Sequence, residues 1–417
     1  MSALGALIGL ILSVVLIIRK VSPVYSLILG AVVGGLLGGV SLVDTIAHMI
    51  EGVKDISPAV IRILAAGVLS GILIKTGAAD SISYTIVKRL GERHVYLALA
   101  LSTMLLTAIG VFIDVAVITV APIALMIGQR LSVNRLKLLF VMIGGGKCGN
   151  IISPNPNTIA AADNFDASLP SVMFVNLIPA IVGLLITVYL IARLMPSRKD
   201  VYHVPVNTFD NESLPSFATS IIAPLVAVIL LALRPLFDIT IDPLIALPAG
   251  GLVGIVAMRK TKTLTEGLRY GLEKMSVVAV LLIGTGTIAG VIKASTMKDV
   301  ILHALEVSGI SDLWIAPISG ALMSAATAST TAGATVASAS FAETILATGI
   351  SAVWGAAMIN SGATVLDHLP HGSFFHATGG AVEMNIKERL KLIPYETIVG
   401  LMLTSGTAIV YYLTNSN

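Results

Sequence analysis

Two stretches that interrupt otherwise apolar sequence decide the fold: GGGKCGNIISPNPNT at residues 144–158 and NSGATVLDHLPHGS at residues 360–373. Proline removes a backbone N–H donor and clashes with the preceding helical turn, and glycine adds conformational freedom. We therefore expect the helix to open at each interruption. Backbone groups freed at membrane depth are tolerated only where protein or a water-filled cavity surrounds them.

The composition predicts a polytopic membrane protein. Of 417 residues, 56% are hydrophobic and 12% are charged, whereas soluble proteins average about 25% charged residues. The net charge of +3 comes without a long basic run, which argues against a nucleic-acid partner. Cys148 is the only cysteine, so no intrachain disulfide can form. Residues 4–18 lack a cleavage site, and we expect a retained span rather than a signal peptide.

Apolar segments of spanning length recur along the whole chain. The candidate spans are residues 4–18, 24–40, 59–74, 97–127, 138–152, 172–194, 220–233, 244–258, 277–292, 313–348, 352–366 and 395–413. Two of them, 97–127 and 313–348, are long enough to be hairpins that enter and leave on one side. We therefore expect an all-α fold.

Matching residues predict an internal duplication. The spacing of Pro23, Gly30 and Gly34 recurs 220 residues later from Pro243, and the offset falls smoothly along the chain. Each half then has about five crossings plus a re-entrant hairpin. Five is an odd number, so the halves must be inverted relative to each other. We expect the paired broken helices to lie at the midplane. The predicted parts are a first repeat at 1–195, a cytoplasmic linker at 196–218 and a second, inverted repeat at 219–417.

Lys and Arg fall on one side of this topology, for example at Arg19 and Lys20 in the first half and at Arg259 and Lys260 in the second. That side is predicted to be cytoplasmic. Both termini would then lie outside the cytoplasm, in a multi-pass protein of the inner (plasma) membrane. Inverted repeats are a recurrent architecture of secondary transporters.

Freed N–H groups at a half-helix start, together with amide and hydroxyl side chains, suit an anionic, oxygen-rich ligand. Such Ser/Thr/Gly stretches also serve as packing surfaces between membrane helices. The second hairpin centre carries the same hydroxyl chemistry as the breaks. The predicted substrate contacts are Lys147, Asn150, Ser153, Asn155, Asn157, Thr158, Thr327, Ser329, Thr330, Thr331, Asn360 and Ser361.

Ionisable residues inside a membrane are costly, so they are candidates for function. We expect proton coupling from Asp114, Asp367, His368 and His371, and charge complementation of the substrate from Lys147. No metal site, cofactor or enzymatic activity is expected, since the histidine cluster lacks a carboxylate–His helix pattern and no P-loop or hydrolase motif is present. A cation/proton antiporter that uses Asp114, Asp367 and Lys147 remains the alternative, and a membrane enzyme is a third reading.

The two interrupted stretches resemble the gluconate permease (GntP) family of the ion-transporter superfamily. The similarity lies in residues 144–149 followed by Ser-Pro-Asn-Pro-Asn and Ala160–Ala162, and in Gly362 followed by Asp367-His368 and Ser373-Phe374-Phe375. The resemblance implies a proton symporter for a small organic anion such as gluconate or another hydroxy-carboxylate. It also implies a homodimer in which a transport domain moves against a scaffold.

Overall fold

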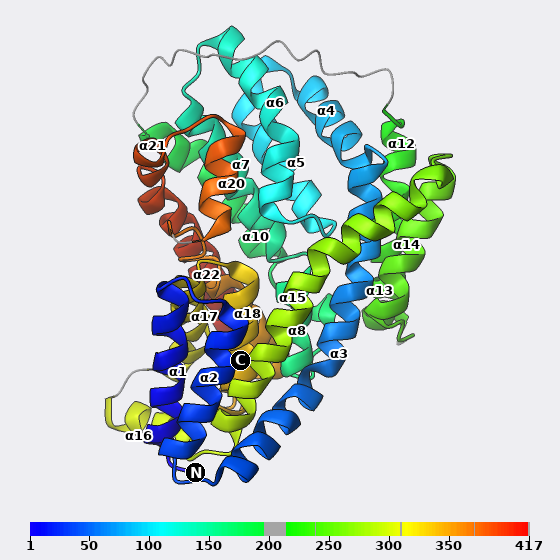
Figure 1. Ribbon diagram of the computed structural model, residues 1–417. Helices are drawn as coiled ribbons and strands as arrows, with labels where there is room; N and C mark the ends of the chain where they lie inside the picture. The colour runs from blue at the N-terminus through cyan, green and yellow to red at the C-terminus, as the bar shows by residue number, and fades with distance from the viewer. Residues whose placement is uncertain (196–213, 238, 309–310, 371, 416–417) are drawn as a thin grey trace.

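The computed structural model describes residues 1–195, 214–237, 239–308, 311–370 and 372–415, and Figure 1 shows that these form helices joined by short turns. No strand occurs within those ranges. Five of the described helical stretches are long and apolar enough to cross a membrane: Leu42–Lys75, Ile113–Leu131, Leu169–Leu194, Thr261–Lys293 and Ile386–Asn415. The predicted all-α membrane fold is confirmed at this level.

The first half of the chain begins with a helical hairpin and is described as far as residue 195. Residues 196–213 of the predicted linker lie outside the described residues. The helices of this half are α1 (Ala3–Ile18), α2 (Pro23–Leu37), α3 (Leu42–Lys75), α4 (Ala78–Leu90), η1 (Glu92–His94), α5 (Val95–Ala108), α6 (Ile113–Leu131), α7 (Arg135–Asn150), α8 (Pro156–Asn164), α9 (Leu169–Val175), α10 (Leu177–Ile186), the π-helix η2 (Thr187–Ile191) and α11 (Ala192–Leu194).

The second half also contains helical hairpins, one long helix and a broken helix. Its helices are α12 (Phe217–Ser220), α13 (Ile222–Phe237), α14 (Pro243–Ala257), η3 (Thr261–Thr263), α15 (Leu264–Lys293), α16 (Met297–Ser308), η4 (Asp312–Trp314), α17 (Ile315–Thr327), α18 (Thr330–Ala347), α19 (Ala352–Gly362), α20 (Ser373–Ala381), α21 (Ile386–Leu390) and α22 (Ile393–Asn415).

The two longest helices, α3 and α15, are longer than the apolar segments that predict them. Each begins in polar sequence, α3 at Leu42 and α15 at Leu264. Polar residues are accommodated there because they point away from the packed face, as the exposed ion pair between Lys54 and Glu51 does. Hydropathy alone therefore places the starts of both helices too late.

Helices α3 and α15 pack against each other through glycines. Figure 1 shows them side by side over much of the molecule. A Cβ built on Gly71 would lie 2.0 Å from the carbonyl oxygen of Gly267, and one on Gly271 would lie 2.0 Å from that of Gly67. Small residues of this kind let the backbones of membrane helices approach closely. The glycines therefore set the spacing of the central helix pair.

Glycine has the same packing role in α7, where the sequence predicts an opening of the helix. The helix runs unbroken through Gly144–Gly149 and ends only at Asn150. Cβ atoms on Gly145 and Gly149 would meet the α5 carbonyl oxygens of Ala100 and Met104 at 2.0 and 2.1 Å. The glycine run therefore fits α7 against α5, and the helix opens just beyond it.

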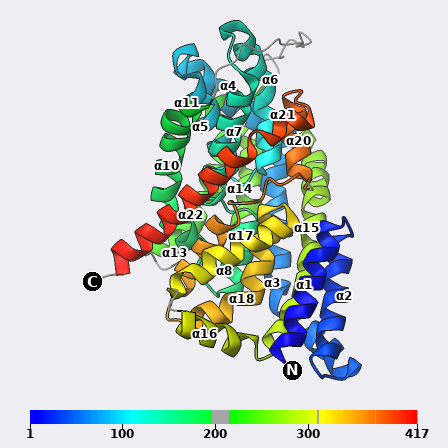
Figure 2. The same cartoon turned by 90° about the vertical axis from the view of Figure 1, so that its left-hand side faces the viewer.

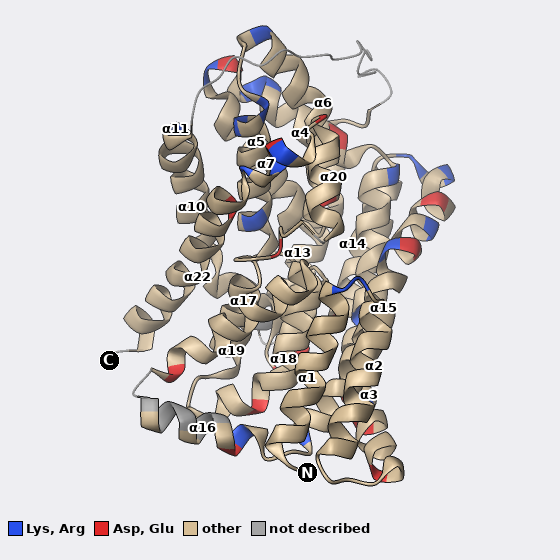
Figure 3. Ribbon diagram, turned by 60° about the vertical axis from the view of Figure 1, so that its left-hand side comes forward, with Lys and Arg blue, Asp and Glu red and all other residues tan. Residues whose placement is uncertain are grey.

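Charge is distributed unevenly over the molecule. Figure 3 shows Lys and Arg gathered at the end that carries α4, α5 and α6, while the N-terminus lies at the other end. Helix α22 crosses the bundle obliquely, and Figure 2 shows it beside α10. The helices between the two ends carry fewer charged residues in this view.

Replacing Gly271 by Ala should destabilise the protein, because the new methyl group meets backbone rather than a side chain that can move. The expected cost is about 1–3 kcal/mol of folding free energy, seen as a lower thermal unfolding midpoint in detergent. The matched control is Gly380→Ala, since nothing lies within 4 Å of a Cβ there. An unchanged midpoint for Gly271→Ala would show that α3 and α15 are not held this closely.

Candidate functional site

Both predicted breaks are present as short non-helical segments between two helices. The first separates α7 from α8, where Asn155 is the N-cap residue and its side chain accepts a hydrogen bond from the Thr158 N–H at 3.2 Å. Pro156 follows at the first helical position, where no N–H is required. The second break lies between the end of α19 at Gly362 and the start of α20 at Ser373.

Two helical hairpins, α5–α6 and α17–α18, bring further helix ends toward the breaks. The turn between α5 and α6 contains Gly110 at φ +100°, a conformation that favours glycine. The turn between α17 and α18 contains Ala328 at φ +47°. Ser329 then caps α18 by accepting a hydrogen bond from the Ala332 N–H at 3.3 Å.

A cavity of about 420 Å³ lies where these elements meet. It is bounded by the first residues of α6, α18 and α20, by the last residue of α7, by Asp367 in the second break and by one face of α15. The lining residues are Phe112, Ile113, Asp114, Val115, Asn150, Glu273, Lys274, Val277, Val278, Leu281, Ala328, Ser329, Thr330, Thr331, Asp367, Ser373 and Phe374.

Three helix N-termini therefore line one cavity. The N–H groups in the first turn of a helix have no carbonyl partner within that helix, and the aligned peptide dipoles add partial positive charge. Anions bind at such ends. Thr330, Thr331 and Ser373 add hydroxyl groups, and Lys274 adds a cation from α15. This lining suits a small molecule that carries both carboxylate and hydroxyl groups.

A buried ion pair lies beside the cavity. Lys147 is fully buried, and its ammonium group donates to Asp367 Oδ1 at 2.7 Å and to the Thr364 carbonyl at 2.5 Å. The other oxygen of Asp367, Oδ2, accepts a hydrogen bond from Thr330 Oγ1 at 2.6 Å. Asp367 therefore joins the second break to the tip of the second hairpin.

The ionic network continues away from the cavity. His368 is 3.0 Å from the Lys147 ammonium through Nδ1, and its Nε2 lies 3.1 Å from both the Ile393 carbonyl and Thr397 Oγ1. Its Nδ1 is also 3.9 Å from the buried carboxylate of Glu396.

Glu396 is paired in turn with the buried Arg389. Nη1 of this guanidinium bonds to Glu396 Oε1, and Nη2 bonds to Oε2 at 3.1 Å. The guanidinium also lies 4.8 Å from the centre of the Phe375 ring. The pair thereby ties α20, α21 and α22 together.

The structure brings some of the predicted site residues to the cavity and places others behind it. Those that line the cavity are Asn150, Ser329, Thr330, Thr331, Asp114 and Asp367. Those outside the lining are Lys147, Ser153, Asn155, Asn157, Thr158, Thr327, Asn360, Ser361 and His368. His371 lies outside the described residues.

Several of the predicted residues behind the cavity brace the first break. Asn360 on α19 donates to the Ile151 carbonyl at 3.3 Å and to Thr158 Oγ1 at 3.1 Å. Asn157 donates to Asn360 Oδ1 at 2.7 Å. Thr327 instead donates to the Met323 carbonyl of its own helix at 2.9 Å.

Two groups of residues near the site were not predicted from the sequence. The α15 residues Lys274 and Val277 line the cavity, but the polar start of α15 reads as a loop. The sequence predicts Arg389 as one of the basic residues of a cytoplasmic loop, yet its side chain is 1% exposed. The early start of α15 could have been predicted from Gly267 and Gly271, whose helical spacing continues into the apolar segment. The sequence carries no comparable signal for Arg389.

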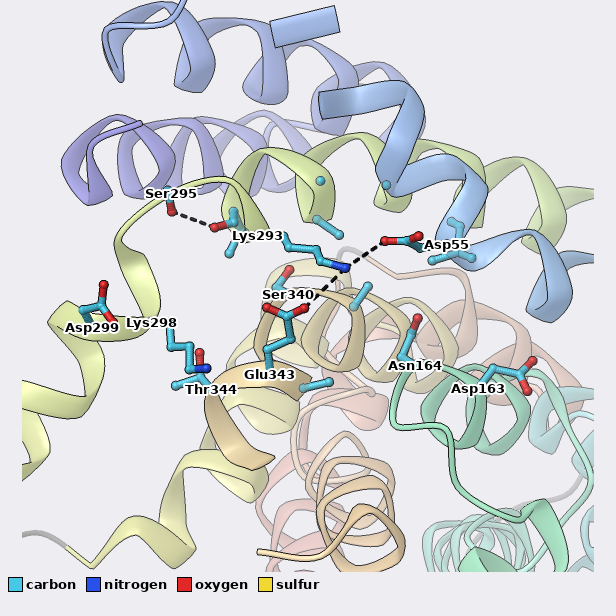
Figure 4. A pocket seen from close by; sticks show the side chains of 17 residues that line it. Asp55, Asp163, Asn164, Lys293, Ser295, Lys298, Asp299, Ser340, Glu343 and Thr344 are labelled. Carbon is cyan, nitrogen blue, oxygen red and sulfur yellow. Dashed lines mark hydrogen bonds and ion pairs between the residues drawn. The ribbon is translucent and has the colours of Figure 1, made fainter. Parts of the chain in front are cut away.

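A second cavity of about 400 Å³ is lined by α3, the end of α8, α15, the start of α16 and the C-terminal half of α18. Figure 4 shows Lys293 pointing between Asp55 and Glu343, and its ammonium lies 3.2 and 3.3 Å from their carboxylates. Asp163 and Asp299 add two more carboxylates, against one further cation, Lys298. Acidic residues outnumber basic ones in this lining, as they also do in the cavity at the helix N-termini. What distinguishes the cavity at the helix N-termini is therefore the three helix ends and not its count of charged side chains.

Apolar helices of membrane length around a polar cavity define a multi-pass membrane transport protein. The chain belongs to the GntP family of permeases, whose family model matches residues 1–415. An uncharacterized transporter from Haemophilus influenzae is 56% identical to this chain over 410 residues, which cover 98% of each protein. The predicted family and the absence of enzymatic activity are thereby confirmed.

More distant relatives agree with this assignment. A high-affinity gluconate transporter from Escherichia coli is 24% identical, over 88% of this chain and 90% of that transporter. The crystal structure of the YdaH transporter from Alcanivorax borkumensis, described as having an unusual topology, matches with a TM-score of 0.61 at 14% identity. That match covers 88% of each chain and concerns the fold alone.

Replacing Arg389 by Gln should destabilise the protein strongly, because it leaves the carboxylate of Glu396 buried without its cation. Breaking a buried pair in this way costs about 3–5 kcal/mol, measured as a fall in the thermal unfolding midpoint. Arg130→Gln is the control, since the Arg130–Glu92 pair is exposed and such pairs contribute about 0–1 kcal/mol. Equal midpoints for the two variants would contradict the buried network.

Proposed function

We propose that this permease is a secondary active transporter that carries a small organic anion, gluconate or another hydroxy-carboxylate, together with protons. The observation that carries the proposal is the convergence of the N-termini of α6, α18 and α20 on one cavity. Its volume of about 420 Å³ falls in the range of about 300–1,000 Å³ typical of small-molecule sites. Gluconate transport by the E. coli relative supports the same substrate class.

In this proposal the carboxylate of the substrate lies at the helix N-termini, near Lys274, and its hydroxyl groups bond to Asn150 and to the hydroxyls of the second hairpin. The polar residues behind the cavity, Asn155, Asn157, Thr158 and Asn360, hold the first break in shape. Their effect on affinity is then indirect. Ser153 and Ser361 are fully buried in this conformation, so their proposed contact with substrate requires the first break and the end of α19 to open.

Proton coupling is assigned to Asp114 and Asp367, the two carboxylates near the hairpin tips, with His368 behind them. Both carboxylates line the cavity. An anionic substrate is repelled by a charged carboxylate, so protonation of Asp114 favours binding of the substrate. The coupling role of His371 rests on the sequence.

We further propose that the halves are inverted repeats in the inner (plasma) membrane, with the Lys/Arg-rich end cytoplasmic. Each half contains a helical hairpin, a long helix, a second hairpin and a broken helix in the same order, which supports the duplication. The homodimer implied by the family resemblance belongs to the same proposal. Transport would expose the site alternately on two sides, as repeat-built transporters do.

Two ion-pair links would hold one of those sides closed. Arg62 on α3 bonds to Asp163 at the end of α8. It also bonds to Asp242, which caps α14, through Nη2 at 2.6 Å and through Nε at 3.1 Å. The Arg62 guanidinium lowers the pKa of the Asp242 carboxyl, so that carboxyl stays charged. Lys293 on α15 links α3 to Glu343 on α18 in the same way.

The function is tested by uptake into proteoliposomes. With an imposed proton gradient, labelled gluconate or another member of a panel of hydroxy acids should accumulate. Collapse of the gradient with a protonophore should abolish the accumulation. Absence of accumulation for the whole panel under both proton and sodium gradients would refute the proposal. Thermal stabilisation by Na⁺ alone, with none by any anion, would favour the cation/proton antiporter.

Replacing Thr330 by Val should weaken substrate binding, because the residue lines the cavity and orients Asp367. A hydrogen bond to a charged group contributes about 1.5–3 kcal/mol, so the apparent affinity should fall by roughly tenfold or more. Calorimetric titration of the purified protein measures this. Thr327→Val is the matched control, since its hydroxyl bonds only within its own hairpin. Equal loss in both variants would contradict the site.

Replacing Arg62 by Gln should favour the conformation in which the side closed by Arg62 is open and the cavity at the helix N-termini is closed. Cys148 is fully buried, so a cysteine at Val277, which is 71% exposed and lines the cavity, reports access in detergent. We expect slower maleimide labelling of Val277→Cys when Arg62→Gln is added. Lys54→Gln, in an exposed pair on the same helix, should leave the rate unchanged. Unchanged labelling with Arg62→Gln would show that Arg62 does not hold that side closed.

A further inference from the structure

The ammonium group of Lys147 sits in a cage of acceptors that belongs to the second break. Its Nζ lies 2.5 Å from the Thr364 carbonyl, 2.7 Å from Asp367 Oδ1 and 3.0 Å from His368 Nδ1. The Glu396 carbonyl of α22 lies at 3.5 Å. One cation is thus surrounded by three oxygen acceptors, two backbone carbonyls and a carboxylate. His368 Nδ1 lies beside them and is also 3.1 Å from Asp367 Oδ1.

Backbone carbonyl and carboxylate oxygens of this kind can coordinate a dissociable monovalent cation. Where a membrane helix is interrupted, unwound carbonyls and the negative end of the half-helix dipole coordinate Na⁺ or H⁺. Helix α19 ends at Gly362, just before Thr364, so its C-terminal end faces this cage. The lysine ammonium is a compact point charge with three donors, which can take the place of such an ion.

The first break differs in charge. Its carbonyl at Ile151 accepts a hydrogen bond from Asn360, a neutral amide at 3.3 Å, and Asn360 also bonds to Thr158. Of these two donors that reach across the halves, only Lys147 carries a positive charge. The second break therefore concentrates a buried cation and a buried carboxylate next to the cavity.

We propose that Lys147 is a tethered substitute for an alkali-metal ion, so that transport by this chain does not use Na⁺. The inference rests on the proposed function and specifies its coupling ion. Without the ammonium, Asp367 would be a buried, uncompensated carboxylate at 2% exposure, and a buried charge of that kind demands a partner. Because Asp367 also lines the cavity, a free cation can reach the cage once the lysine is shortened.

The test measures the effect of Na⁺ on Lys147→Ala. Wild-type protein and variant are purified in detergent, and their unfolding midpoints are followed while NaCl replaces choline chloride at constant ionic strength. The variant should unfold at lower temperature than wild type in choline and recover in a saturable way with Na⁺. The wild type should show no Na⁺-specific shift. The double variant Lys147→Ala, Asp367→Asn should lose the response, because the cage is then neutral.

A Na⁺-specific, saturable shift in the wild type, or none in Lys147→Ala, would overturn the inference. If Lys147→Ala does not fold, Lys147→Met replaces it, and wild-type proteoliposomes provide a second measurement. Proton-driven uptake of gluconate should proceed equally in sodium and choline buffers, and a requirement for Na⁺ would overturn the inference. No uptake of any anion under either gradient would refute the proposed function instead, while the Na⁺ titration would still decide on the cage.

Discussion

The structure depends on how backbone groups freed inside an apolar protein find partners. Interrupting α7 and α19 leaves carbonyl and N–H groups without helical partners, and an unsatisfied buried polar group costs about 1–3 kcal/mol. The partners come from the opposite half of the chain. Lys147 on α7 donates to the Thr364 carbonyl in the second break, and Asn360 on α19 donates to the Ile151 carbonyl in the first.

This exchange of donors explains why the two breaks lie together. A break in one half is stable only when the helix of the other half lies against it, so the halves cannot separate without exposing both. The same arrangement leaves the N-terminal ends of α6, α18 and α20 directed at shared space. The meeting of three helix N-termini at one cavity thus follows from the requirement that broken helices be braced.

The breaks could be predicted from the sequence because their causes are local. Pro154 and Pro156 end one helix and begin the next whatever surrounds them, and Lys147 and Asp367 are conspicuous charges in apolar segments. Partners, in contrast, are set by tertiary packing. The sequence predicts Lys147 as a substrate contact, whereas the structure turns its ammonium toward Asp367. No local sequence pattern distinguishes a buried arginine such as Arg389 from an arginine in an exposed loop.

Helix α18 connects the two cavities, and this places a constraint on any transport cycle. Its first residues, Thr330 and Thr331, line the cavity at the helix N-termini, while Ser340 and Glu343 near its other end line the acidic cavity. A rigid helix that lines both cannot move at one end alone. The Lys293–Glu343 contact and the Thr330–Asp367 hydrogen bond thus lie on the same helix. In the proposed cycle, α18 would therefore link access on one side to the contacts of Asp367.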